Sequence, residues 1–384
     1  MENNSVDLVD VNFVGISASA AIPGGTLKIW TRVAVTSDDS LFYSIIGGIT
    51  GAIEGWLRKS DKFIDLATAN SVVLVVKQDN TAKLWVDNLK IAANTRIRRA
   101  RPFDVGDIIY EDDVVDILSI SFPEIELHPE DRILCILRDR WHFVLFFDLD
   151  RTADLDVASV QRTLGALYRK IRYADLYAAL SQERLFAGIV SAGWFPFLEL
   201  MQGEFRLLVS MLEAELPLEY AEEDLLAKFD DARVDRIFDR WMQRSHFIER
   251  KDILRSAIDR FKARDPVPVI KIILSEIEGI MADAFYRATG EHTARIDRLL
   301  SHVVEAAEQQ AGQADTLLFP SAFARYLRDY TYAGFTPGLR SEAVSRNAVG
   351  HGVASSDQYT MVRALQALLT LDQLAFYSLF KLPD

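Results

Sequence analysis

The chain has 384 residues, of which 49% are hydrophobic and 26% are charged, and its formal net charge at pH 7 is −13. This composition is typical of a folded globular protein rather than a disordered one, and the length predicts two or three domains. The acidic balance argues against a non-specific polyanion binder, because contacts to phosphate groups need local positive charge.

Residues 1–152 are predicted to form a β-rich domain, either a sandwich or a sheet packed against a helix. β-branched and aromatic runs separated by polar turns predict two hairpins, at residues 71–77 with 82–86 and 132–137 with 141–147. Further strands are expected at residues 8–16 and 114–121. The apolar run at residues 41–56 fits either a helix or a strand pair, and its length of about 16 residues is too short to span a bilayer.

The one cysteine, Cys135, lies in an apolar run of the second hairpin. A single cysteine cannot form an internal disulfide or a thiolate metal site, so we expect a buried structural thiol. The N-terminal residues lack the basic and apolar segments of a secretory signal. With no membrane span expected either, the sequence predicts a cytoplasmic protein.

Residues 153–264 are predicted to form a helical linker domain. Apolar residues recur at three- and four-residue steps in residues 157–180 and 197–216, which is the helical period. Residues 221–262 interleave charges of both signs, and this pattern is typical of a solvated helix face with local ion pairs.

Residues 265–384 are predicted to form a bundle of four helices, so that the expected fold class is α+β. Gly290 and the proline at position 320 are among the residues that mark helix ends, and the helices are expected at residues 267–289, 293–311, 320–332 and 357–380. The apolar stripe of the last helix is expected to be core or a dimer interface.

The segment between the last two helices combines residues that suit the cleavage of RNA. Arg346 can grip a phosphate with a planar fork of donors, and His351, five positions later, can move a proton at neutral pH. Arginine stands five to seven positions before four of the six histidines, so the spacing alone is weak. Only here does a small hydrogen-bonding residue, Asn347, follow the arginine while glycines flank the histidine.

With this motif, the chain resembles the C-terminal half of a HEPN domain, a small helical module of prokaryotic toxins and antiviral defence systems. The resemblance includes Tyr359 and the residues 361–372, and the stretch 270–280 is similar to the long first helix of such domains. It covers roughly the last third of the chain. Many members of the family are metal-independent endoribonucleases, so the resemblance implies cleavage to 2′,3′-cyclic phosphate and 5′-hydroxyl ends.

In that function, His351 is expected to act as general base or acid and Arg346 to stabilise charge on the phosphoryl oxygens. Asn347 is expected to orient Arg346 or the phosphate. Glu276 and Glu278 on the first helix, and Tyr359, are expected to support the site, although each glutamate could equally be a structural partner of an arginine. No cofactor and no metal is expected.

The expected partners are RNA as a transient substrate and a second copy of the chain. A two-fold dimer through the C-terminal domain would bring two copies of His351 into one cleft, as the resemblance also implies. The β-rich region is then expected to sense a trigger or bind a regulatory partner. The alternative is a non-catalytic interaction protein, whose HEPN-like bundle dimerises and whose sheet binds a partner.

Overall fold

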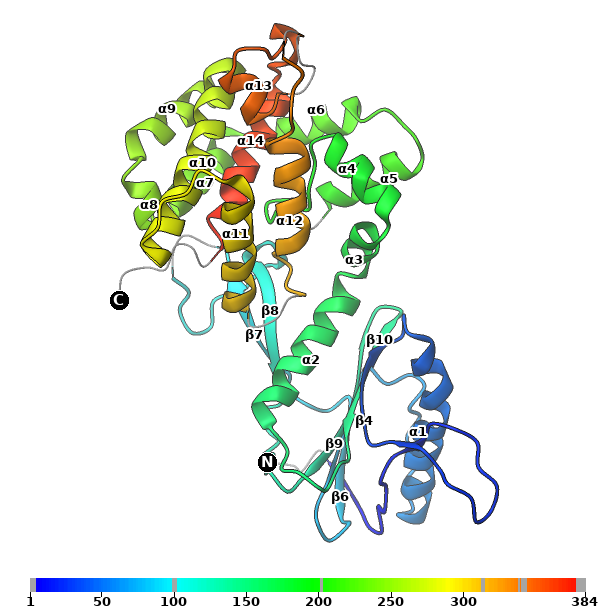
Figure 1. The fold of residues 1–384 in the computed structure, drawn as a ribbon. Coiled ribbons are helices and arrows are strands. Elements are labelled where there is room, and N and C mark those ends of the chain that lie inside the picture. The colour runs from blue at the N-terminus through cyan, green and yellow to red at the C-terminus, as the bar shows by residue number, and fades with distance from the viewer. Residues whose placement is uncertain are drawn as a thin grey trace. The chain divides into compact units, whose positions relative to one another are not determined.

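The computed structural model describes residues 5–98, 102–200, 203–311, 315–337, 339 and 344–377, with the backbone alone described at residues 245, 246, 310 and 311. The chain divides into two compact units (Figure 1). The sheet unit consists of Met1–Arg96 and Ile117–Ala174, and the helical unit of Ile97–Asp116 and Asp175–Asp384. An antiparallel sheet followed by helices confirms the α+β class. The units cut across the expected limits at residues 152 and 264, and those domain limits stay a prediction.

A six-stranded antiparallel sheet forms the centre of the sheet unit, in the order β1-β6-β5-β9-β10-β4. Both predicted hairpins are present and neighbour each other in this sheet. The strands are β1 (Val6–Leu8), β4 (Arg32–Thr36), β5 (Ser71–Val76), β6 (Ala82–Val86), β9 (Arg132–Asp139) and β10 (His142–Asp148).

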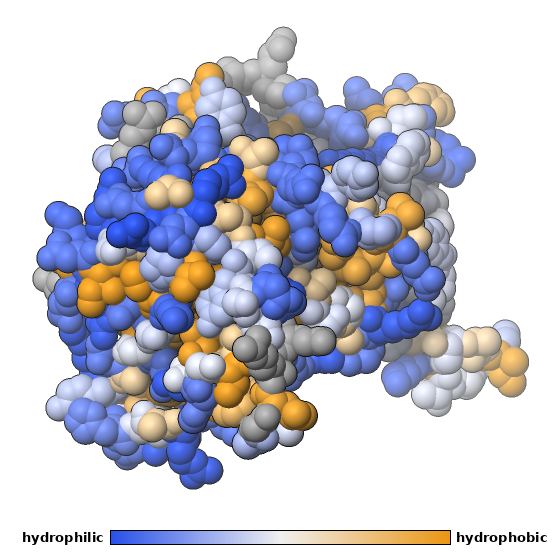
Figure 2. Space-filling view, turned by 90° about the horizontal axis from the view of Figure 1, so that it is seen from above, coloured by the Kyte–Doolittle hydropathy of each residue, from blue (hydrophilic) through white to orange (hydrophobic). Residues whose placement is uncertain are grey.

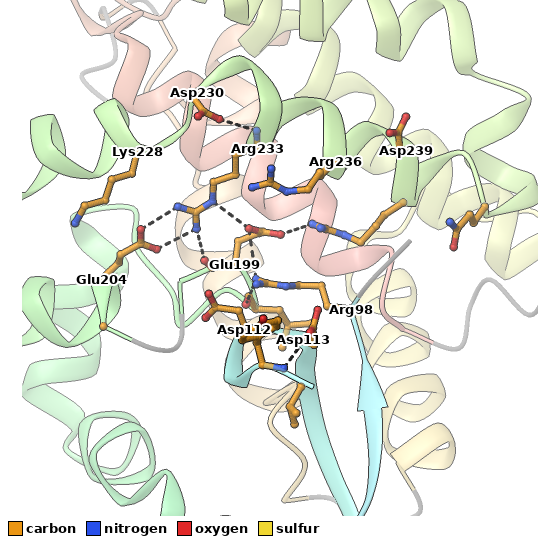
Figure 3. A pocket seen from close by; sticks show the side chains of 16 residues that line it. Arg98, Asp112, Asp113, Glu199, Glu204, Lys228, Asp230, Arg233, Arg236 and Asp239 are labelled. Carbon is orange, nitrogen blue, oxygen red and sulfur yellow. Dashed lines mark hydrogen bonds and ion pairs between the residues drawn. The ribbon is translucent and has the colours of Figure 1, made fainter. Parts of the chain in front are cut away.

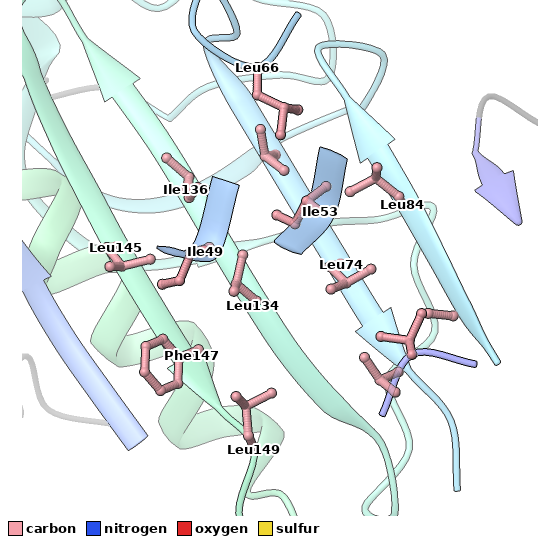
Figure 4. Close-up of a cluster of buried hydrophobic side chains, with 14 of the residues drawn as sticks. Ile49, Ile53, Leu66, Leu74, Leu84, Leu134, Ile136, Leu145, Phe147 and Leu149 are labelled. Atoms are coloured by element: carbon pink, nitrogen blue, oxygen red, sulfur yellow. The ribbon is translucent and has the colours of Figure 1, made fainter. Parts of the chain in front are cut away.

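One face of the sheet is covered by α1 (Ser40–Lys59), which is the apolar run that the sequence left undecided. Its buried residues recur at three- and four-residue steps and pack against alternate residues of the strands, including Leu74, Leu134 and Phe147 (Figure 4). The glycines of this helix have open space around them, so they lie on its outer side. Helical rather than strand periodicity therefore decides the structure of this segment.

The other face of the sheet packs against α2 (Val157–Arg172), which contacts β4, β9 and β10. Cys135 lies in β9 with a fully buried side chain, and burial raises the pKa of its thiol. The expectation of a buried structural thiol is thus confirmed.

Gly165 of α2 lets the helix approach β8 (Val114–Ser121) at very short range. A Cβ atom at Gly165 would lie 2.6 Å from Cα and 2.8 Å from N of Ser119, and 2.9 Å from the carbonyl oxygen of Leu118. All three atoms belong to the backbone, so the strand would have to move to accept a methyl group.

We therefore expect Gly165→Ala to lower the free energy of unfolding by about 1–3 kcal/mol. Gly51→Ala is the matched control, because Gly51 is also helical but has open space around it. Alanine at Gly51 should raise the free energy of unfolding by about 0.5–1 kcal/mol. Urea denaturation of both variants measures the two effects, and equal changes would contradict the close packing of α2 on β8.

Two short two-stranded sheets complete the β structure. One joins β2 (Ile16–Ser17) to β3 (Ile29–Trp30), and the other joins β7 (Ala92–Ile97) to β8. The predicted strand at residues 8–16 is wrong in its middle, because Asp10 adopts a left-handed φ of 56° and the extended path breaks there. Both β7 and β8 run from one unit into the other, so neither unit is a continuous stretch of chain.

Most helices of the helical unit are short, and the longest is α10. α10 begins with a proline in its first turn and ends at Gly290, which adopts the left-handed conformation. The helices are α3 (Ala174–Ser181), α4 (Glu183–Ser191), α5 (Glu204–Glu213), α6 (Glu219–Lys228), α7 (Asp231–Trp241), α8 (Ser245–Ile248), α9 (Lys251–Lys262), α10 (Pro266–Thr289), α11 (Ile296–Ala311), α12 (Pro320–Tyr326), the π-helical turn η2 (Leu327–Thr331), α13 (Arg346–Gly350) and α14 (Met361–Leu374), with 3-10 turns at η1 (Glu111–Asp113) and η3 (Ser356–Gln358).

α14 lies in the core of the helical unit. Every residue from Ala364 to Leu374 is buried, and the helix packs along α10. Its apolar stripe is therefore core within one chain and is not left over as a dimer interface. Within the described ranges, no helix combines the length and the apolar character needed to cross a bilayer.

The segment 97–116 contributes a buried carboxylate to the helical unit. Asp116 has no exposed surface, and the hydroxyl of Thr316, 200 residues later in the chain, donates a hydrogen bond to it. The carboxylate also lies 3.5 Å from the backbone nitrogen of Leu317. These bonds fix the start of β8 to the loop before α12.

Candidate functional site

The Arg346–His351 motif forms a helix of its own, α13, which packs against α10. Ser345 caps its first turn by accepting a hydrogen bond from the backbone nitrogen of Ala348 at 3.2 Å. His351 ends the helix, and Gly352 follows with a left-handed φ of 69°. The Arg346–His351 motif therefore coincides with a single short helix that Ser345 caps at its first turn.

Arg346 is held from one side by a carboxylate of α10. Its Nε lies 2.6 Å from Oε2 of Glu278, and the two side chains are 37% and 28% exposed. Among the described residues, no hydrogen-bond partner contacts the terminal Nη atoms of Arg346. One edge of the guanidinium thus pairs with Glu278, and within the described residues the other edge, which can bind anions in a forked geometry, has no hydrogen-bond partner. Glu342, four residues before Arg346, lies outside the described residues.

His351 is exposed at the other end of α13 and lies against Phe335, with ring centroids 4.9 Å apart. The contact limits the rotation of the imidazole without burying it. His351 thus stands five residues after Arg346 in the chain, at the end of α13, with its imidazole accessible to solvent.

Asn347 holds the motif in place. Its Nδ2 donates to the carbonyl oxygen of Tyr332 at 2.8 Å and lies 3.4 Å from that of Ala333. The hydroxyl of Ser345 also donates to the Ala333 carbonyl, at 2.8 Å. Asn347 therefore fixes α13 to the end of the preceding helical segment, and its expected action on Arg346 or on a phosphate stays a prediction.

The two glutamates of α10 both pair with arginines, but they do so in different places. Glu278 binds Arg346, whereas Glu276 binds Nε of Arg250 at 2.8 Å. Glu276 is thus a structural partner, and Glu278 is the one that belongs to the motif. Tyr359 lies half-buried after η3, and burial raises the pKa of its hydroxyl.

Tyr332 is a neighbour of the motif that the sequence did not single out. Its ring is 8% exposed, and its hydroxyl is buried with no hydrogen-bond partner among the described residues. Burial, followed by the negative charge of Glu278, raises the pKa of this hydroxyl, and the positive charge of Arg346 opposes that rise. No local signal distinguishes Tyr332 from the other tyrosines near it in the sequence.

The other arginine–histidine spacings lead to different surroundings. His292, five residues after Arg287, stacks on Tyr286 with ring centroids 4.1 Å apart, while Arg287 pairs with Glu249 at 2.8 Å. His302 lies edge-on to a phenylalanine, and burial lowers its pKa. His292 and His302 therefore each contact an aromatic residue of α10.

A second polar site is a cavity of about 980 Å³ on one side of α7 (Figure 3). Its wall carries basic and acidic side chains in nearly equal number, centred on Glu199, which is 7% exposed. Glu199 binds Arg233 at 3.3 Å, lies 3.4 Å from Arg98, and also binds Arg240. Arg233 and Arg240 thus turn inward, contrary to the solvated face that the charge pattern predicts.

This charged cluster is balanced within the helical unit. Arg233 also binds both oxygens of Glu204, at 2.9 and 3.0 Å, and Arg240 binds Asp372 of α14 at 2.9 Å. Arg98, Arg233 and Arg240 therefore each face a carboxylate, and removal of one of these carboxylates would leave a buried charge without its partner.

Comparisons extend the description of the site no further. Among the described residues, no group of three histidine, cysteine, aspartate or glutamate side chains is arranged to hold a metal ion. Comparison of the chain with protein-family models, with curated proteins and with solved structures finds no match.

Proposed function

We propose that α13 carries a metal-independent endoribonuclease site of the HEPN type. The observation that supports it is the state of Arg346, whose Nε is anchored by Glu278 while its Nη atoms face no partner among the described residues. His351 lies exposed at the end of the same short helix. An anchored arginine and an exposed histidine are the two groups that such a reaction requires.

The proposed reaction is an internal phosphoryl transfer in RNA. The ribose 2′-oxygen forms a bond to the adjacent phosphorus, the bond from phosphorus to the 5′-oxygen breaks, and a 2′,3′-cyclic phosphate and a 5′-hydroxyl result. His351 removes the proton of the 2′-hydroxyl or supplies one to the leaving 5′-oxygen. Arg346 stabilises the negative charge that builds on the phosphoryl oxygens.

One chain supplies one histidine, whereas the reaction gains from both an acid and a base. We therefore propose a two-fold dimer that brings a second His351 to the substrate. Because α14 is buried in the core of one chain, the proposed dimer must form through another surface of the helical unit. Figure 2 views the molecule from above, the side on which α13 lies in Figure 1, and the surface seen there is largely hydrophilic with hydrophobic patches between. The sheet unit would then sense a trigger.

The test is cleavage of a defined oligoribonucleotide by the purified protein in EDTA, with analysis of the product ends. We expect cyclic-phosphate and 5′-hydroxyl ends from the wild type, and a loss of activity of about a hundredfold or more for His351→Ala. An oligodeoxyribonucleotide of the same sequence lacks the 2′-hydroxyl and should stay intact. Equal cleavage by both proteins would show that His351 is not catalytic. Absence of cleavage by the wild type would favour a non-catalytic interaction protein.

A further inference from the structure

Gly350 is the last residue of α13, and its backbone conformation does not require a glycine. Gly350 does not adopt a positive φ, whereas Gly352, two residues later, has a left-handed φ of 69°. Within a helix, glycine is less favourable than alanine, because it loses more conformational freedom on folding. Where a residue opposes the local structure without a structural reason, a functional reason is expected.

The space beside Gly350 holds the end of the Arg346 side chain. Gly350 follows Arg346 by four residues, so both lie on the same face of α13. A Cβ atom at Gly350 would lie 3.7 Å from Nη1 of Arg346. Apart from its chain neighbours and the backbone of α13, no other heavy atom of the described residues would lie within 4 Å of it. Gly350 is exposed, so the space beside Nη1 opens to solvent.

This space adjoins both groups of the proposed reaction. Glu278 holds Arg346 by its Nε at 2.6 Å, and Nη1 lies on the side of Gly350. His351 is the next residue of the chain, and neighbouring Cα atoms are about 3.8 Å apart. An anion that binds Nη1 beside Gly350 is therefore close to the backbone from which His351 projects.

A methyl group at position 350 would compete with such an anion. A phosphate oxygen bonded to a guanidinium nitrogen lies about 2.7–2.9 Å from it. The added Cβ would lie 3.7 Å from the same nitrogen, so it would exclude oxygens that approach from that side. That distance is an ordinary van der Waals contact, so the guanidinium itself would not have to move. Gly350→Ala is thus compatible with the free protein but not with an anion bound there.

We infer that Gly350 is a specificity-determining position, where an RNA phosphate binds Arg346 in the space that a larger residue would fill. This inference rests on the proposed function, because it takes the anion at Arg346 to be a phosphodiester of RNA. The missing side chain lets the sugar–phosphate backbone approach α13 closely.

The test measures binding of a single-stranded oligoribonucleotide with 2′-O-methyl groups, which cannot be cleaved because its 2′-oxygens carry no proton. We expect Gly350→Ala to melt at the wild-type temperature or above it, and to raise the Kd for this ligand about tenfold. Gly51→Ala is the matched control, because Gly51 is also exposed and helical, and nothing lies within 4 Å of its Cβ position. Gly51→Ala should also melt no lower than the wild type, but it should keep the wild-type Kd.

A double-mutant cycle with Arg346→Ala shows whether the methyl group acts through the arginine. If it does, Gly350→Ala should change the Kd little in the Arg346→Ala background. Loss of one phosphate contact to a single strand should reduce the slope of log Kd against log salt concentration by about 0.7. Gly350→Ala and Arg346→Ala should reduce that slope equally.

Three results would overturn the inference. They are an unchanged Kd in Gly350→Ala, a full tenfold effect of Gly350→Ala in the Arg346→Ala background, and a melting temperature of Gly350→Ala below that of the wild type. The last result would mean that the space beside Gly350 is not open.

The failures of the two proposals can be told apart. A wild type that binds the ligand but cleaves no RNA would refute the nuclease, and the Kd of Gly350→Ala would then decide the role of Gly350 alone. A wild type that cleaves RNA while Gly350→Ala binds as tightly would refute only the role of Gly350. A wild type that neither binds nor cleaves would refute both.

Discussion

Arg346→Ala is expected to reduce kcat/KM for RNA cleavage by about 10²–10³-fold, because a preorganised donor to a developing oxyanion has effects of this size. Arg346→Lys should lose nearly as much. Lysine has one ammonium group, so it cannot be held by Glu278 and present a planar fork to the phosphate at the same time. Initial rates with a fluorescent oligoribonucleotide in EDTA measure both variants.

The control for Arg346 is Arg287→Ala. Arg287 stands five residues before a histidine, as Arg346 does, and its guanidinium also binds a glutamate, Glu249, at 2.8 Å. We expect this variant to cleave RNA at the wild-type rate. A comparable loss in Arg287→Ala would mean that surface charge, rather than the site on α13, controls the rate. Wild-type activity in Arg346→Lys would show that a single positive charge is enough.

Glu199→Ala is expected to lower the free energy of unfolding by about 3–5 kcal/mol, because it leaves buried arginines without their shared carboxylate. Arg240 and Arg233 are 11% and 15% exposed and would face one another's charge. Glu291→Ala is the control: its pair with Arg298 is 2.7 Å long but largely exposed, so the expected change is below about 1 kcal/mol. Chemical denaturation gives both values, and equal effects would contradict a stabilising role for the buried cluster.

Glu199→Ala should also change how the free energy of unfolding depends on pH. Burial opposes ionisation of Glu199, but Arg240, Arg98 and Arg233 outweigh it and lower its pKa from the ordinary 4.5 to about 2. Because the folded-state pKa is lowered, this carboxylate stabilises the protein fully above pH 4.5, and its contribution disappears as the pH falls toward 2. The difference in unfolding free energy between wild type and Glu199→Ala should therefore shrink over that range. A difference that stays constant would contradict the lowered pKa.

Much of the fold follows from local signals in the sequence. The hairpins were predictable because β-branched runs alternate with polar turns, and α10 because Pro266 and Gly290 mark its ends. The predicted helix at residues 157–180 is instead two helices, α2 and α3, that meet at Tyr173 without a proline or glycine. Tertiary packing decides such a break, and periodicity does not record it.

The candidate site was predictable only in part. The sequence identified Arg346, Asn347 and His351 but not the five-residue helix α13, which is too short to show a period. It left open which glutamate of α10 pairs with Arg346, since Glu276 and Glu278 differ only in the direction that the folded helix gives them. Tyr332 and the inward-turned Arg233 and Arg240 depend on contacts between distant segments, which no local pattern contains.

The passage of β7 and β8 through both units has a consequence for how the chain can fold as it leaves the ribosome. The last residue of the sheet unit, Ala174, is synthesised early, but Asp116 must wait for Thr316, 200 residues further on. At about 5–20 residues per second, this wait lasts roughly 10–40 s. During that time the sheet unit can fold with α1 and α2 packed on its sheet. The carboxylate of Asp116 still lacks the part of the helical unit that will bury it. A nascent chain halted before residue 316 would therefore expose segment 97–116 to proteases and chaperones.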